Sequence, residues 1–163
     1  MGWSKHHKFG LIHKTPAATY RGYTILTVSV GDQAMLVDMD GRVCHRWQYD
    51  GGISYARVLP GGNLLLRAKA TGDDEMVRGL GGSAPALVEL DWDSNKVWEY
   101  NDPMLHHDYA RLPNGNTLAL LFEAMSPEES AAVKGGYASD EDPDQMLGDI
   151  VREIAPDGET LNE

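Results

Sequence analysis

The chain has 163 residues, of which 42% are hydrophobic and 24% charged, and its net charge is -11 at pH 7. This composition is ordinary for one globular domain. The excess of acidic residues argues against nucleic-acid binding, which needs clustered lysine and arginine, and no apolar run approaches the roughly 18 residues of a membrane span. We therefore expect a soluble cytoplasmic protein with a small-molecule substrate, and with neither nucleic acid nor a membrane as partner.

Residues 1–22 show no strand pattern, and we expect them to form an N-terminal extension. Residues 23–163 alternate short apolar segments with glycine-containing turns, which is typical of antiparallel strands. The first group of strands, at about 23–50, lacks an innermost member. Its three predicted strands cover residues 23–30, 34–39 and 42–49.

Two further groups, at about 53–101 and 105–163, are each predicted to form four strands. The predicted strands cover residues 53–59, 63–69, 85–91 and 96–100 in one group, and 106–112, 116–123 and 149–155 with a truncated outer strand in the other. The last group also carries an insertion at 123–148, where Ser126, Pro127 and Glu129 form a capping box that predicts a short helix.

The strand groups are copies of one another. Tyr-Ala-Arg-Val-Leu-Pro-Gly-Gly-Asn at 55–63 returns as Tyr-Ala-Arg-Leu-Pro-Asn-Gly-Asn at 109–116, with the two Leu-Pro turns 53 residues apart. Matching Trp47 with Trp98 gives a separation of 51 residues. A repeat of about 50 residues falls in the range of propeller blades and lies above the periods of the common helical repeats.

Four antiparallel strands per repeat indicate a β-propeller, so the predicted fold class is all-β with four-stranded blades. Propellers close with about four to eight blades, whereas this sequence supplies about 2.5. The tryptophan expected in the last outer strand would fall one residue beyond the sequence. We therefore expect an incomplete propeller that a second polypeptide or a C-terminal fragment completes.

Residues of the outer strands are assigned structural roles. Cys44 is the only cysteine, so no internal disulfide can form, and its place in an alternating strand predicts a buried inert thiol. Trp47 and Trp98 are expected to pack between blades. His45 is expected to lie on the surface.

The strongest candidate site is His106-His107-Asp108, at the start of an inner strand where the preceding repeat has Ile-Ser-Tyr. In a blade, this end of the strand lies near the mouth of the central channel, on the same face as the long insertions at about 70–84 and 123–148. Neighbouring residues on a strand point to opposite sides. Both histidines can therefore face the channel only if the start of the strand is irregular.

Three interpretations of this motif are open. A single imidazole, from His107 or His106, can act as an acid, a base or an anion donor, with Asp108 fixing its tautomer. Either histidine can instead be one ligand of a divalent metal whose other ligands come from neighbouring blades. The third interpretation is a loop-capping role without chemistry. Arg67 and Tyr109 are further candidates for substrate binding.

Three stretches carry a family resemblance: Ala-Ala-Thr-Tyr-Arg-Gly-Tyr-Thr-Ile-Leu at 17–26, the Asp-Gly turn with Arg-Val-Cys-His-Arg-Trp within 36–47, and His-His-Asp-x-x-x-Leu-Pro-Asn-Gly-Asn-Thr-Leu at 106–118. Together they resemble the arylsulfotransferase family of β-propellers. The resemblance implies a six-bladed propeller that transfers a sulfuryl group from an aryl sulfate to a phenol through a histidine of a later blade. It also implies that His107, with His106, belongs to the residues around the sulfate.

The leading hypothesis is therefore an arylsulfotransferase-like enzyme with its active site at the mouth of the channel. One alternative is a metal-dependent lyase, hydratase or hydrolase on the same propeller, with a divalent metal as its cofactor. The other is a non-catalytic propeller whose acidic face recognises a partner.

Overall fold

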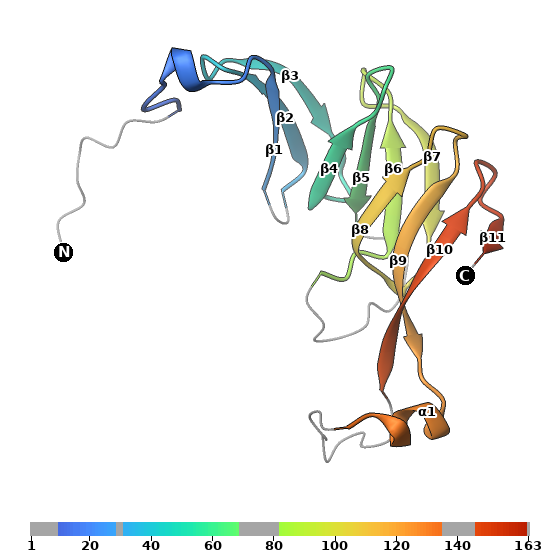
Figure 1. The fold of residues 1–163 in the computed structure, drawn as a ribbon. Coiled ribbons are helices and arrows are strands. Elements are labelled where there is room, and N and C mark those ends of the chain that lie inside the picture. The colour runs from blue at the N-terminus through green and yellow to red at the C-terminus, as the bar shows by residue number, and fades with distance from the viewer. Residues whose placement is uncertain (1–9, 29–30, 69–81, 135–145, 163) are drawn as a thin grey trace. The chain divides into compact units, whose positions relative to one another are not determined.

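A computed structural model of the chain describes residues 10–28, 31–68, 82–134 and 146–162. The described part is all-β, as predicted, with three antiparallel sheets of three, four and four strands (Figure 1). The chain divides into two compact units, Met1–Ala68 with Val88–Trp98, and Lys69–Leu87 with Glu99–Glu163.

The first sheet belongs to the first unit and has the order β1-β2-β3. Its strands are β1 (Tyr23–Thr27), β2 (Gln33–Asp38) and β3 (Val43–Gln48), preceded by a 3-10 turn at Pro16–Ala18. The β2–β3 turn is held by Asp38, whose Oδ1 accepts hydrogen bonds from the backbone N–H groups of Asp40 and Arg42 at 2.8 and 2.9 Å. In this tight turn, the Asp38 carboxylate thus takes the place of backbone carbonyl groups as the hydrogen-bond acceptor.

The second sheet has the order β4-β5-β6-β7. Its strands are β4 (Tyr55–Val58), β5 (Leu64–Ala68), β6 (Ala86–Leu90) and β7 (Lys96–Asn101). Strand β5 reads Leu-Leu-Leu-Arg-Ala, and all three leucines are fully buried. Strand β5 is therefore buried on both faces of the sheet, which explains why it shows a continuous apolar run instead of an alternation.

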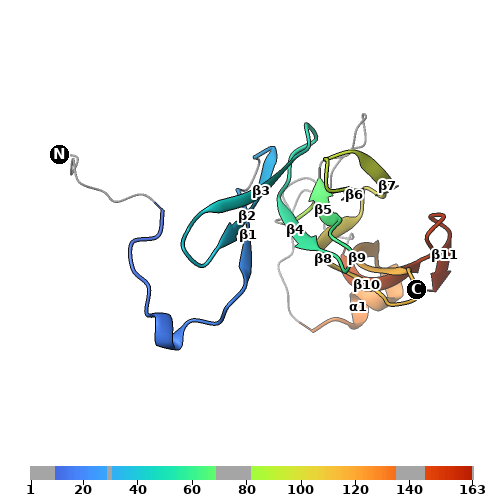
Figure 2. The same ribbon diagram turned by 90° about the horizontal axis from the view of Figure 1, so that it is seen from above.

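The third sheet has the order β11-β10-β9-β8 (Figure 1, Figure 2). All of its strands belong to the second unit. Its strands are β8 (Leu105–Arg111), β9 (Thr117–Ala124), β10 (Leu147–Ile154) and β11 (Thr160–Asn162). The β9–β10 connection contains helix α1 (Pro127–Ala132). The predicted capping box is confirmed, because Ser126 and Glu129 exchange side-chain and backbone hydrogen bonds at the start of α1.

The structure corrects the spacing of the repeat. Asp38 N–H bonds the carbonyl of Arg42 in the β2–β3 turn, and Asp91 N–H bonds the carbonyl of Asn95 in the β6–β7 turn, so the equivalent aspartates are 53 residues apart. The separation of 51 residues that matched Trp47 with Trp98 is therefore wrong. Strand patterns repeat every two residues, so a slip of two keeps every side chain on its own face and escapes detection.

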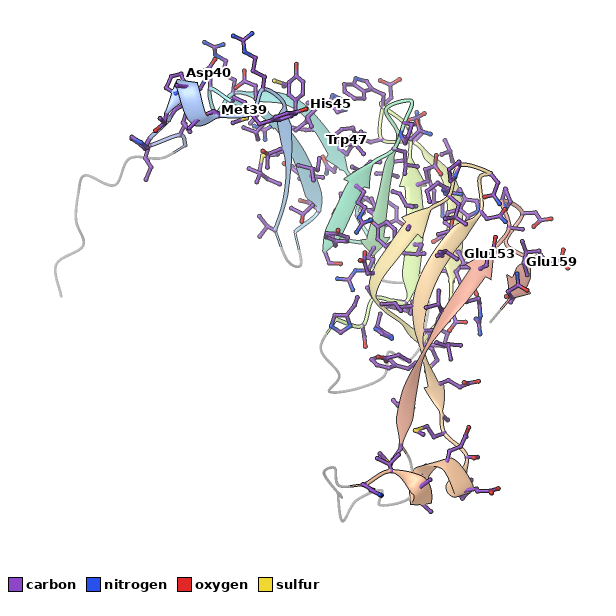
Figure 3. All side chains as sticks on the ribbon, viewed as in Figure 1. Met39, Asp40, His45, Trp47, Glu153 and Glu159 are labelled. Atoms are coloured by element: carbon purple, nitrogen blue, oxygen red, sulfur yellow. The ribbon has the colours of Figure 1, made fainter. Side chains whose placement is uncertain are left out.

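Trp47 and His45 join the first sheet to the β6–β7 turn (Figure 3). Trp47 is fully buried, and its Nε1 donates a hydrogen bond to the carbonyl of Asp91 at 3.1 Å. The ring of His45 stacks on Trp92 with 3.8 Å between centroids, and its Nε2 lies 2.9 Å from the Trp92 carbonyl oxygen. The expected packing role of Trp47 is confirmed, and His45, which was expected on the surface, is half-buried against Trp92.

Cys44 is exposed, so the expected buried thiol is also wrong. Strand β3 is the edge strand of the first sheet, and its register with β2 shifts between Leu36 and Val37. The alternation around Cys44 therefore does not place it against a neighbouring layer. Sγ of Cys44 lies 3.6 Å from the carbonyl oxygen of Arg42.

Candidate functional site

Strand β8 is interrupted by two extra residues at the predicted site. His106 pairs with Leu120 and Tyr109 pairs with Ala119, so His107 and Asp108 have no counterpart on β9. His107 adopts a φ of 48°, in the left-handed region that residues with a side chain rarely occupy. The strand start is therefore irregular, which is the condition under which both histidines can lie on one side.

His106 is buried among residues of the β9–β10 hairpin. It is 4% exposed, and its ring stacks on Phe122 with 3.9 Å between centroids and 21° between planes. Its Nε2 lies 3.4 Å from Oδ1 of Asp149, which is longer than an ordinary hydrogen bond, so we treat this contact as electrostatic. Phe122 and Asp149 are themselves cross-strand partners. The lengthened hairpin that carries α1 thus supplies both contacts.

His107 lies beside His106 and against the segment that returns from the first insertion. The two Nδ1 atoms are 3.0 Å apart, within hydrogen-bond distance. The backbone N–H of His107 donates to the carbonyl of Gly82 at 3.0 Å, and the neighbouring Ser83 forms a bridge to His106. A Cβ atom at Gly82 would collide with Nε2, Cε1 and Cδ2 of the His107 ring. Gly82 also has a φ of 79°, so both the space and the backbone at this position favour glycine.

These contacts favour one distribution of protons between the two rings, whose donor and acceptor roles depend on their tautomers. The Asp149 carboxylate favours a proton on Nε2 of His106. The neutral ring of His106 then offers the lone pair of Nδ1, to which His107 donates its Nδ1 proton. Nε2 of His107 is left with a lone pair on an exposed side chain. This arrangement can accept a proton from a bound molecule.

The other predicted site residues have different surroundings. Oδ1 of Asp108 accepts a hydrogen bond from the N–H of Tyr109 at 2.8 Å, and Tyr109 is 3% exposed. The position expected for Asp108, beside the buried imidazole, is taken by Asp149. Arg67 lies in the first unit, where its guanidinium carbon is 5.8 Å from the centroid of the Tyr55 ring.

Phe122 and Asp149 were missed in the sequence because they are remote from the motif along the chain. Phe122 follows the motif on the next strand, and Asp149 comes after the second insertion. No signal in the sequence marked them, because the strands predicted at 116–123 and 149–155 are about as long as those predicted at 63–69 and 85–91. Only the structure shows that β9 and β10 have eight residues each, whereas β5 and β6 have five.

A repeated polar pair lies at the opposite end of the hairpins. Nδ2 of Asn63 donates to Oε1 of Glu89 at 2.7 Å in the second sheet, and Nδ2 of Asn116 donates to Oε1 of Glu153 at 2.7 Å in the third. The Asn116 side chain, with a smaller contribution from Asn162, lowers the pKa of the Glu153 carboxyl below its usual value. These pairs fix the Gly-Asn turns and have no counterpart among the candidate site residues.

The described ranges of the chain contain no group of three or more histidine, cysteine, aspartate or glutamate side chains arranged to hold a metal ion. A protein zinc site uses about three or four such ligands. Any metal bound by His106 or His107 would therefore need ligands from outside the described residues. In the same described part, no helix has the length and apolar character needed to cross a bilayer.

Comparisons with known proteins place the chain in no named family. No family model matches it, and no curated protein matches it. A crystal structure of a protein of unknown function from Bacteroides caccae is similar, with 21% sequence identity and a TM-score of 0.46 over 86% of this chain and 41% of the other. This chain therefore spans less than half the length of that protein.

Proposed function

We propose that the chain is part of a β-propeller enzyme in which His107 acts as the general base of a sulfuryl-transfer reaction. The observation that carries this proposal is the left-handed His107 in the two-residue bulge, with its Nδ1 3.0 Å from Nδ1 of His106. Left-handed backbone at a residue with a side chain costs about 1–3 kcal/mol, and such outliers cluster at active sites.

The propeller part of the proposal is supported by the repeated turns. The β2–β3 and β6–β7 turns have the same hydrogen bonds, and the first sheet packs through its outer strand on the turn of the second. Two sheets have four strands each, as propeller blades do. The proposal keeps the expectation that other chain segments complete the propeller. One of these segments would supply the nucleophilic histidine of a later blade.

The proposed step involves the acceptor hydroxyl. Nε2 of His107 takes the proton of a phenol, the phenol oxygen forms a bond to sulfur, and the bond from sulfur to the leaving group breaks with its electron pair. His106 and Asp149 hold the acceptor tautomer of His107 and stabilise the cation that forms. A positioned base of this kind contributes about 10²–10⁴-fold to the rate.

The proposal is tested by measuring transfer from 4-nitrophenyl sulfate to a phenol with the purified protein. The His107→Ala variant is expected to lose about 100-fold or more of the rate. His13→Ala is the matched control, because His13 is exposed and bonds only Thr15 among the contacts described for it. The proposal is wrong if the two variants transfer equally well, or if the protein with its complete set of blades transfers no sulfuryl group.

A further inference from the structure

The two imidazoles at the bulge of β8 have the spacing of a metal chelate. The Nδ1 atoms of His106 and His107 lie 3.0 Å apart. An imidazole nitrogen binds a divalent transition metal at about 2.0–2.1 Å, so a metal bound by both atoms would have an angle of about 95° between them. This is close to the right angle between neighbouring ligands of a square-planar or octahedral ion. A tetrahedral zinc ion would need about 3.3 Å between the two nitrogens.

Only one proton has to move for the pair to bind a metal. In the proton distribution that the contacts favour, His106 carries its proton on Nε2 and already offers the lone pair of Nδ1. His107 would lose its proton from Nδ1 and gain one from the solvent on Nε2. Both rings stay neutral, which is the form of imidazole that binds metals. The exposed side chain of His107 makes the turn that directs both lone pairs to one point.

Asp149 supplies the outer contact that metal-binding histidines usually have. Its Oδ1 lies 3.4 Å from Nε2 of His106, the ring nitrogen that would face away from the metal. A carboxylate at this place fixes the tautomer and raises the basicity of the ligating nitrogen. Phe122 fixes the plane of the same ring by stacking on it with 3.9 Å between centroids. The buried His106 is therefore held ready as a ligand, and the exposed His107 completes the chelate.

We propose that His106 and His107 together bind a divalent transition-metal ion through their Nδ1 atoms, and that Cu²⁺ is the ion held most tightly. Cu²⁺ accepts ligands at right angles in a square plane and has the highest affinity of the divalent first-row metals for nitrogen sites. Within the described ranges no third histidine, cysteine or carboxylate side chain joins the pair, so water would occupy the other positions. The site therefore differs from a structural metal site, which has about four protein ligands.

A metal at this site would switch off the base that the proposed function requires. Binding at Nδ1 places the proton of His107 on Nε2, the nitrogen that would otherwise accept the proton of the phenol. This consequence rests on the proposed function, whereas the metal site itself does not. Metal binding and loss of sulfuryl transfer should therefore follow the same dependence on metal concentration.

The test is a titration of the purified metal-free chain with Cu²⁺, followed by calorimetry and by pulsed electron paramagnetic resonance. His6 and His7 lie outside the described residues, and both are replaced by alanine in every sample to remove a competing pair. The expected result is one ion bound by two imidazoles. His107→Ala should weaken binding by about 100-fold or more and leave one imidazole, because the chelate is lost. His13→Ala is the matched control and should bind as the unaltered chain does, since His13 is exposed and remote from β8.

Asp149→Asn tests the outer contact. The variant keeps the size of the side chain but loses the carboxylate beside His106, and it should bind Cu²⁺ about 10-fold more weakly. Asp108→Asn is the matched control, because it removes the same charge next to the pair while Oδ1 of Asp108 faces the N–H of Tyr109. Its loss should stay below about threefold, as expected for a screened charge. Equal losses would show that charge alone sets the affinity and would overturn the role of Asp149.

Two results would overturn the metal site: Cu²⁺ bound by fewer than two imidazoles, or equal affinities of His107→Ala and His13→Ala. The inhibitory consequence has its own measurement, because sulfuryl transfer should fall as the site fills and return when EDTA removes the metal. Unchanged transfer by a protein with a filled site would overturn the inhibition alone. Absence of transfer by the metal-free protein with its complete set of blades would contradict the proposed function, and the binding measurements would still decide the metal site.

Discussion

Strands β4 and β8 occupy the same place in two copies of the repeat, yet only β8 carries a candidate site. In β4, Tyr55 and Ala56 pair with consecutive residues of β5, Arg67 and Leu66. In β8, His106 and Tyr109 pair with the equivalent consecutive residues of β9, Leu120 and Ala119. Two residues, His107 and Asp108, are inserted between them. The regular strand is a structural element, whereas the interrupted one presents an exposed imidazole.

The comparison also shows that the Tyr-Ala-Arg triplets of the two strands are not structural equivalents. By register, Tyr55 corresponds to His106, and Ala56 corresponds to Tyr109. Ala56 and Tyr109 are each 3% exposed, so the same buried position accepts a small and a large residue. The candidate site therefore lies where the repeat departs from its pattern.

The largest expected effect comes from truncating the two equivalent residues. His106→Ala removes a buried ring stacked on Phe122 and should cost about 2–3 kcal/mol of unfolding free energy. Tyr55→Ala removes a half-buried ring and should cost about 1 kcal/mol. Urea denaturation of both variants measures the difference. Equal losses would contradict the burial of His106 in the bulged strand.

Gly82→Ala should cost about 2 kcal/mol of unfolding free energy, because it adds a clash with the His107 ring to the strain of a positive φ. Gly61→Ala in the β4–β5 turn is the matched control. Gly61 also has a positive φ, of 104°, but a Cβ there meets no atom within 4 Å. The control should therefore cost about 1 kcal/mol. Thermal unfolding distinguishes the two, and equal costs would show that His107 does not lie on Gly82.

His107→Gly should raise the unfolding free energy by about 0.5–1 kcal/mol, because glycine relieves the left-handed strain at this position. The same change on the regular strand, Arg57→Gly, should lower it by about 1 kcal/mol. A gain in stability from removing a side chain would show that His107 is retained at a cost to the fold. If both substitutions destabilised the protein, the left-handed backbone of His107 would carry no strain and would not support a functional role.

The smallest effect concerns acid stability at the hairpin turns. Asn116→Ala should raise the pKa of Glu153 back toward its usual value, since the Asn116 amide is the main cause of the lowered pKa. A lowered pKa stabilises the folded state above the pKa of the unfolded chain, and this contribution is lost as the pH falls through the folded value. In the variant, the contribution of Glu153 to the loss of folded-state stability at acid pH should therefore disappear. Asn63→Ala, the equivalent change in the second sheet, should leave the NMR titration of Glu153 unchanged.

Much of the fold followed from local sequence signals. The turns at Gly41 and Gly115, the strands around them and the capping box of α1 all depend on neighbouring residues, so periodicity and turn chemistry were sufficient to predict them. The 53-residue spacing was visible at the Leu-Pro turns, but the same phase was not recovered for the outer strands. A two-residue slip preserves strand alternation, and the pairing of Trp47 with Trp98 was such a slip.

The candidate site was recoverable only in part. The His-His-Asp motif identified His106 and His107 as candidates. Because neighbouring residues on a regular strand point to opposite sides, an irregular strand start was needed to bring the two side chains together. Neither signal located the irregularity, because a bulge depends on pairing with β9 and with Ser83, which are distant in sequence. The contact of Asp149 with His106 could not be predicted for the same reason, because the two residues are distant in sequence. Burial of Cys44 was mispredicted because alternation does not reveal which side of an edge sheet has a neighbour.

The protonation of the histidine pair tests the account most directly. Long-range proton–nitrogen NMR correlations of the imidazole rings, recorded where both rings are neutral, identify the protonated nitrogen of each histidine. The account predicts a proton on Nδ1 of His107 and on Nε2 of His106, with Nε2 of His107 unprotonated. A proton on Nε2 of His107 would contradict it, because this nitrogen would then have no lone pair with which to act as a base.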